Sequence, residues 1–157
     1  MLEVGAKAPD FTAVTDAGEP FRLADWLGSR HVVLYFYPKD FTTGCTRQAC
    51  AFRDNYEEIL AEGATIAGVS TDDAESHRRF KEQYDLPFTL IADADKQVTR
   101  LYDAERRFIL PGAQRVTYVI DKEGIVRGAF RHELAIGRHQ DDVLRTLRAI
   151  NRVSSER

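Results

Sequence analysis

The sequence is poor in cysteine and proline, with two and five of them among 157 residues. Two cysteines cannot form the disulfide framework of a small secreted domain. Long apolar runs are also missing: the strongest, residues 32–37, is far shorter than the about 20 residues of a membrane helix. Positive charge is not in excess, because 22 basic residues face 25 acidic ones and the net charge is −3. We therefore expect neither a membrane nor a nucleic acid as a partner.

The composition that remains, 43% hydrophobic and 30% charged, is that of an ordinary globular protein. The length predicts a single domain over residues 1–157. The first residues, MLEVGAKAPDF, show neither the basic nor the apolar region of a secretory signal. We expect a soluble, cytoplasmic protein. In that reducing compartment a pair of cysteines is free, metal-binding or catalytic rather than structural.

Strand and helix patterns alternate along the chain. They predict a hairpin at Phe11–Leu23, a buried strand at His31–Tyr37, a helix at Thr46–Glu62 ended by Gly63, a buried strand at Thr65–Ser70, a helix at Ala74–Tyr84 capped by Thr71 or Asp72, paired strands at Val116–Ile120 and Ile125–Phe130, and a helix at His139–Arg152. This order favours an α/β fold in which helices flank both faces of a central mixed β-sheet. With its N-terminal β-hairpin, it fits a thioredoxin-like fold best.

The two cysteines fall on different faces of the Thr46–Glu62 helix. A stripe at helical spacing marks its core face and consists of Ala49, Phe52, Tyr56 and Ile59. Cys45 projects onto this stripe, whereas Cys50 lies about 140° away from Cys45. A core position therefore suits Cys45, while Cys50 would need a different contact.

Cys45 also stands at the start of the helix, where unpaired amides and the helix dipole stabilise a reactive thiolate. In a regular helix its Cα lies about 8 to 9 Å from that of Cys50, while a disulfide needs less than about 7 Å. A bond between them would require the first turns to unwind. Without its context, the cysteine pair is as compatible with two inert buried thiols as with a reactive pair. A metal site has less support, because the four histidines (His31, His77, His132 and His139) cluster with neither cysteine.

The context of Cys45 carries a family resemblance. Pro38, Thr42 and Cys45 form the pattern P-x-x-x-T-x-x-C directly after a buried strand, within FYPKDFTTGCTRQACAFRD. This segment closely resembles the active-site segment of peroxiredoxins, most of all the bacterioferritin-comigratory (Q-type) subfamily, an atypical 2-Cys group. Further similar blocks are VGAKAPDF, GVSTD, LPF and RVTYVID, so the resemblance covers almost the whole chain.

The resemblance implies a thiol-dependent peroxidase that reduces hydrogen peroxide and organic hydroperoxides without a cofactor or metal. Cys45 is then the peroxidatic cysteine and Cys50 the resolving one, which forms an intramolecular disulfide with it. Thioredoxin or a similar dithiol protein would reduce that disulfide. The remaining site residues would be Thr42 and Arg115, which hold the peroxide and the thiolate, Pro38, which shields the pocket from water, and Gly44, whose amide joins that of Cys45 as a hydrogen-bond donor.

The chain departs from the subfamily pattern D-D-T-P-G-C at two positions, with Phe41 in place of an acid and Thr43 in place of proline. Neither change removes a catalytic group, and Phe41 makes the entrance more apolar. Three other functions stay open: a disulfide reductase, which the missing C-x-x-C disfavours; a redox sensor, which would turn over slowly with a reductant; and a holdase. The sequence leaves open a monomer or a weak dimer. Asp93-Ala94-Asp95 lacks the glycine of a calcium loop, and we expect a solvated turn there.

Overall fold

The computed structural model describes residues 1–106, 112–131 and 138–155. Its strands form a seven-stranded sheet in the order β2-β1-β5-β4-β3-β6-β7. These strands are β1 (Thr12–Thr15), β2 (Pro20–Arg22), β3 (His31–Phe36), β4 (Ala64–Ser70), β5 (Thr89–Ala92), β6 (Val116–Ile120) and β7 (Val126–Arg131). The described helices are α1 (Leu23–Trp26), α2 (Thr43–Asp54), α3 (Tyr56–Ala61), α4 (Ala74–Tyr84), α5 (Gln97–Leu101) and α6 (Arg138–Ser155).

The sheet is mixed, as predicted. β3 runs parallel to β4, and β4 runs parallel to β5. The predicted hairpins are confirmed as the antiparallel pairs β1–β2 and β6–β7, and β6 also pairs antiparallel with β3. Because β3 and β4 are parallel, the segments that follow them leave the sheet at the same edge.

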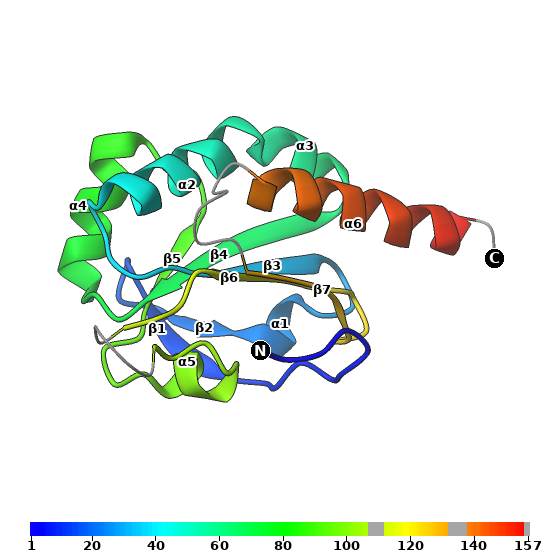
Figure 1. Cartoon of the computed structure of the whole chain (residues 1–157), viewed down its shortest axis with the longest axis horizontal. Coiled ribbons are helices and arrows are strands. Elements are labelled where there is room, and N and C mark those ends of the chain that lie inside the picture. The colour runs from blue at the N-terminus through cyan, green and yellow to red at the C-terminus, as the bar shows by residue number, and fades with distance from the viewer. Residues whose placement is uncertain (107–111, 132–137, 156–157) are drawn as a thin grey trace.

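Two layers of apolar side chains cover the two faces of the sheet, because successive residues of a strand point to opposite sides. Along β3, Val33 and Tyr35 join the core under α2, α4 and α6, whereas Val32 and Leu34 join the core beside α1 and α5. Figure 1 shows α2, α3, α4 and α6 on one side of the sheet and α1 and α5 on the other. The thioredoxin-like fold with helices on both faces is therefore confirmed. Within the described ranges, no helix is long and apolar enough to cross a membrane.

The predicted helix at Thr46–Glu62 is wrong in two respects. α2 starts three residues earlier, at Thr43, and the helix is interrupted at Asn55 before α3 begins. The Asn55 side-chain amide donates to the Ala51 carbonyl at 2.8 Å, so the side chain competes with the backbone for a helical acceptor. Gly63, with φ of +78°, ends the helical segment as predicted.

Several short elements were not predicted: α1, β5 and α5 have only four or five residues each. The expected cap of α4 is also wrong, since Asp73 accepts from the Ser76 amide at 2.8 Å. Asp93 is not in a solvated turn: it is buried and accepts hydrogen bonds from the amides of Val98 and Thr99 at the start of α5. His132 lies outside the described residues.

Candidate active site

Cys45 lies where the loop after β3 enters α2. Thr42 occupies the N-cap position and Thr43 is the first helical residue, so Cys45 is in the first turn. The first intrahelical hydrogen bond of this turn joins the Thr46 amide to the Thr42 carbonyl at 2.9 Å. The amides of Thr43, Gly44 and Cys45 precede it and have no acceptor within the helix. They therefore supply donors and positive potential beside the sulfur, as the sequence indicated.

The core-facing stripe of the cysteine helix is confirmed. Cys45, Ala49, Phe52 and Ile59 are buried, and Tyr56 packs partly buried against the same core. Cys50, on another face, is half-buried. Both cysteines are free thiols. Because α2 begins at Thr43, only two helical residues precede Cys45.

Arg115 reaches the sulfur from the segment just before β6. Its Nη2 lies 3.5 Å from Cys45 Sγ, and its Nη1 donates to Gln48 Oε1 at 2.7 Å. Arg115 and Gln48 are both buried. Gly112 helps to bring this segment close, because a Cβ at Gly112 would lie 3.3 Å from the Pro38 carbonyl oxygen. The guanidinium group thus holds a positive charge against the thiol in a site that excludes most water.

Gln48 is a site residue that the sequence reasoning missed. It lies three residues after Cys45, so the two side chains project from one side of the helix. A polar residue beside the apolar stripe was the signal that could have identified it. Its Oε1 fixes one end of the guanidinium group, which leaves the other end directed at the sulfur.

Thr42 differs from the expectation. Its side chain is exposed and makes no helix-capping bond. The hydroxyl donates to the Lys39 carbonyl at 2.8 Å. A hydroxyl has one proton, so in this state it cannot also donate to Cys45. It retains its lone pairs as acceptors for a hydroperoxide proton.

Tyr35, on β3 below α2, completes the surroundings of Cys45. Burial raises the pKa of the Tyr35 hydroxyl well above its ordinary value, and the nearby charge of Cys45 raises it further. Tyr35 therefore stays neutral. The Tyr35 hydroxyl, the Thr46 hydroxyl and Gln48 Nε2 are buried, and none has a hydrogen-bond partner among the described residues. Polar atoms without partners are costly to bury, and two of these residues, Thr46 and Gln48, lie within one turn of Cys45 on α2.

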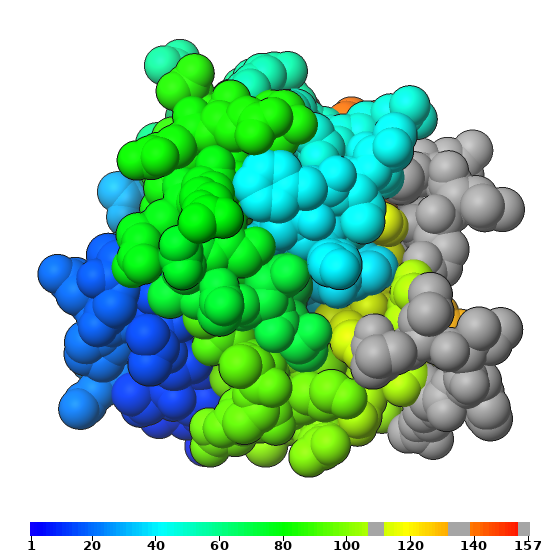
Figure 2. Space-filling model, turned by 90° about the vertical axis from the view of Figure 1, so that its left-hand side faces the viewer, coloured from blue at the N-terminus to red at the C-terminus, as the bar shows by residue number. Residues whose placement is uncertain are grey.

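The loop between Pro38 and α2 is attached to α4 through two of its residues, Asp40 and Phe41. Asp40 is buried and binds His77, while Phe41 is 44% exposed and its ring contacts Phe80 at 5.2 Å between centroids. Phe41 has a φ of +65°, a conformation that costs free energy in a bulky residue. In Figure 2 this loop and the start of α2, in cyan, reach the surface beside α4 in green. Pro38 itself is partly buried.

A thioredoxin-like fold with a buried cysteine in the first turn of a helix, facing an arginine, defines a thiol-dependent redox protein. Residues 4–129 match the model of the AhpC/TSA family. Peroxiredoxin Bcp of Bacillus subtilis is 40% identical over 152 residues, which cover 94% of this chain and 96% of that protein. The chloroplastic peroxiredoxin Q of Arabidopsis thaliana is 43% identical over 147 residues, which cover 92% and 67%. The crystal structure of peroxidoxin BcpB from Mycobacterium tuberculosis superposes with a TM-score of 0.90 at 34% identity, covering 96% of this chain and 99% of that one.

The chain therefore belongs to the AhpC/TSA family, and within it to the peroxiredoxins of the Bcp and Q type. It is an oxidoreductase with peroxidase activity, as expected from its sequence.

Proposed function

We propose that this peroxidase works through Cys45 as the peroxidatic cysteine and Cys50 as the resolving cysteine. The observation that carries the assignment is the Arg115 guanidinium 3.5 Å from Cys45 Sγ at the start of α2. The Cys45 thiolate attacks the terminal oxygen of a hydroperoxide, the O–O bond breaks, and the alkoxide or hydroxide leaves as alcohol or water after taking a proton. Cys45 is left as a sulfenic acid.

Arg115 and the first-turn amides of α2 supply fixed donors for the charge that moves from sulfur to the departing oxygen. The buried Thr46 hydroxyl and Gln48 amide, which have no partners among the described residues and lie within one turn of Cys45, support a small polar substrate. Thr42 accepts a hydrogen bond from the hydroperoxide O–H in this proposal, and the partly buried Pro38 shields the pocket. The exposed ring of Phe41 beside the loop supports organic hydroperoxides as a second substrate class.

In the second step the Cys50 thiolate attacks Sγ of the Cys45 sulfenic acid, and hydroxide leaves to form water. The two sulfurs then share a disulfide, which a dithiol such as thioredoxin reduces by exchange. The helical separation of the two Cα atoms, about 8 to 9 Å, means that the first turn of α2 unwinds in this step. Plant relatives are named as chloroplastic proteins, so the cytoplasmic location expected from the sequence stays a prediction.

The test is a count of free thiols by mass spectrometry after one equivalent of hydrogen peroxide, with rapid alkylation. We expect both thiols of the wild-type protein to be lost within one monomer. Cys50→Ser is expected to stop at a sulfenic acid on Cys45, and Cys45→Ser to keep its remaining thiol. A wild-type protein in which Cys50 stays alkylatable would refute the two-cysteine mechanism, and slow loss of Cys45 would refute the peroxidatic assignment.

A further inference from the structure

A buried ion pair joins the loop before α2 to helix α4. His77 Nδ1 lies 2.7 Å from Asp40 Oδ2, and both side chains are completely buried. His77 Nε2 lies 2.9 Å from the Ile91 carbonyl, which can only accept, so this nitrogen carries a proton. A proton on Nδ1 as well makes the ring an imidazolium, which matches the carboxylate that it faces.

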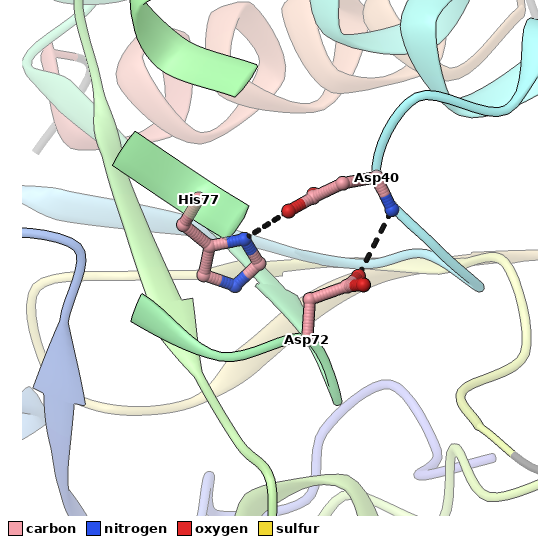
Figure 3. Close-up of side chains that lie close together, drawn as sticks. All are labelled: Asp40, Asp72 and His77. Carbon is pink, nitrogen blue, oxygen red and sulfur yellow. Dashed lines mark hydrogen bonds and ion pairs between the residues drawn. The ribbon is translucent and has the colours of Figure 1, made fainter. Parts of the chain in front are cut away.

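Further hydrogen bonds fix Asp40 in place. The Tyr37 hydroxyl donates to Asp40 Oδ1 at 2.6 Å, and the Ser76 hydroxyl donates to Oδ2 at 2.8 Å. The Asp40 amide donates to Asp72 Oδ2 at 2.9 Å, as Figure 3 shows. Although Asp40, Asp72 and His77 lie close enough to suggest a metal site, protein donors already occupy both carboxylates. The group instead fixes the backbone of the loop before α2 to α4 and to the loop after β4.

These hydrogen bonds hold the segment that must move if Cys45 is to reach Cys50. Asp40 is two residues before the N-cap of α2 and five before Cys45. The next residue, Phe41, also contacts α4 through Phe80. Two successive loop residues are therefore bound to α4, whereas the Thr42 side chain makes no capping bond to α2. This attachment adds resistance to unwinding of the first turn.

We propose that the Asp40–His77 pair is a latch that positions the first turn of α2 and limits its opening. This inference rests on the proposed two-cysteine mechanism. With the latch closed, Cys45 stays beside Arg115, where it reacts with peroxide. Opening the latch releases Cys45 toward Cys50. The latch thus sets the balance between disulfide formation and further oxidation of the sulfenic acid to sulfinic acid by a second peroxide.

The charge of the latch depends on pH. The groups that face His77 are Asp40 and Tyr37 from the segment after β3, Asp72 from the loop after β4, and the Ile91 carbonyl of β5. Burial alone lowers the pKa of His77, but the hydrogen bond and charge of Asp40 outweigh it and leave the pKa raised. A raised pKa gives stabilisation that is complete below about pH 6.5 and is lost as the pH rises through the folded value. The first turn should open more readily in alkaline solution.

The test compares His77→Gln with His31→Gln, which changes another buried histidine at the opposite end of β3. Hydrogen exchange of reduced protein is followed in peptides that cover residues 41–50, and stopped-flow kinetics measures Cys45–Cys50 disulfide formation. We expect His77→Gln to increase both rates about fivefold or more and to lower sulfinic acid formation at high peroxide. After correction for base-catalysed amide exchange, the variant should lose the remaining alkaline rise in exchange that the wild type shows. His31→Gln should match the wild type in residues 41–50.

Equal exchange in the two variants, or unchanged disulfide formation with His77→Gln, would overturn the latch. Ser76→Ala removes one donor to Asp40 and tests the same idea with a milder change if His77→Gln does not fold. We expect it to give an intermediate increase, and wild-type exchange would count against the latch. A wild-type protein that forms no Cys45–Cys50 disulfide would refute the proposed function instead, while exchange in the reduced protein would still test the latch.

Discussion

Replacing Arg115 by lysine tests whether the fork of the guanidinium group, rather than its charge, activates Cys45. Arg115 uses one nitrogen for Gln48 Oε1 and the other for Cys45 Sγ, at 2.7 and 3.5 Å. A lysine keeps the positive charge but has a single ammonium group, which cannot hold both partners in this geometry. The variant therefore loses one hydrogen bond that involves a charged group, which is worth about 1.5 to 3 kcal/mol.

If that loss applies fully to the transition state, about 1.4 kcal/mol per tenfold change in rate gives a decrease of about 10- to 150-fold. The assay is the second-order rate of Cys45 oxidation by hydrogen peroxide in a Cys50→Ser background, so that only the first step is observed. The sulfenic acid is trapped and counted by mass spectrometry. Thermal unfolding of each variant checks that the fold is intact.

Gln48→Leu is the matched control. It keeps Arg115 but removes the acceptor that fixes its Nη1, so we expect a smaller decrease, between those of the wild type and Arg115→Lys. A rate for Arg115→Lys within threefold of the wild type, in a folded protein, would refute the argument from geometry. It would mean that positive charge alone near the sulfur is sufficient.

Two further predictions concern stability. Gly68 pairs with Tyr35 across β3 and β4, and a Cβ at this position would lie 2.8 Å from the Tyr35 ring. Gly68→Ala is therefore expected to lower the free energy of unfolding, measured by chemical denaturation, by about 1 to 3 kcal/mol. An unchanged denaturation midpoint would contradict this packing. Burial tends to raise the pKa of Asp121, but its hydrogen bond with Arg127 and those with backbone amides leave the pKa lowered. Its contribution is therefore complete above about pH 4 and is lost as the pH falls through the lower folded value. Asp121→Asn should reduce the loss of stability on acidification, and identical pH profiles would show that Asp121 does not contribute.

The longer elements could be predicted because each one repeats its pattern over several residues. The unbroken apolar run of β3 indicated a strand buried on both faces, and the stripe of α2 placed Cys45 toward the core. The short elements could not be predicted in this way. The four residues of β5, for example, cover only two periods of the side-to-side alternation that marks a strand. The break at Asn55 depends on one side-chain hydrogen bond to Ala51, and helical periodicity carries no information about it.

The site was only partly predictable for a related reason. Cys45 and its helix start are neighbours in sequence, so local rules identified them. Gln48 was accessible to the same rules, because a buried amide three residues from a thiol shares its side of the helix. His77 was not: its partner Asp40 is 37 residues away and on a different element. Only the fold shows that this histidine faces a carboxylate inside the core.

In the proposed two-cysteine mechanism, this difference explains how the chain combines a rigid site with a helix that unwinds. The contacts that hold the Cys45 sulfur come from α2 and from the segment before β6, and they favour the closed state in which peroxide reacts. The contacts that hold the loop before α2 come from α4, through Asp40 and His77. Because the two sets involve different elements, a change in α4 can alter the opening of the first turn while Arg115 and Gln48 stay in place. Reactivity toward peroxide and the rate of resolution can then vary separately, which a site built from one element would not allow.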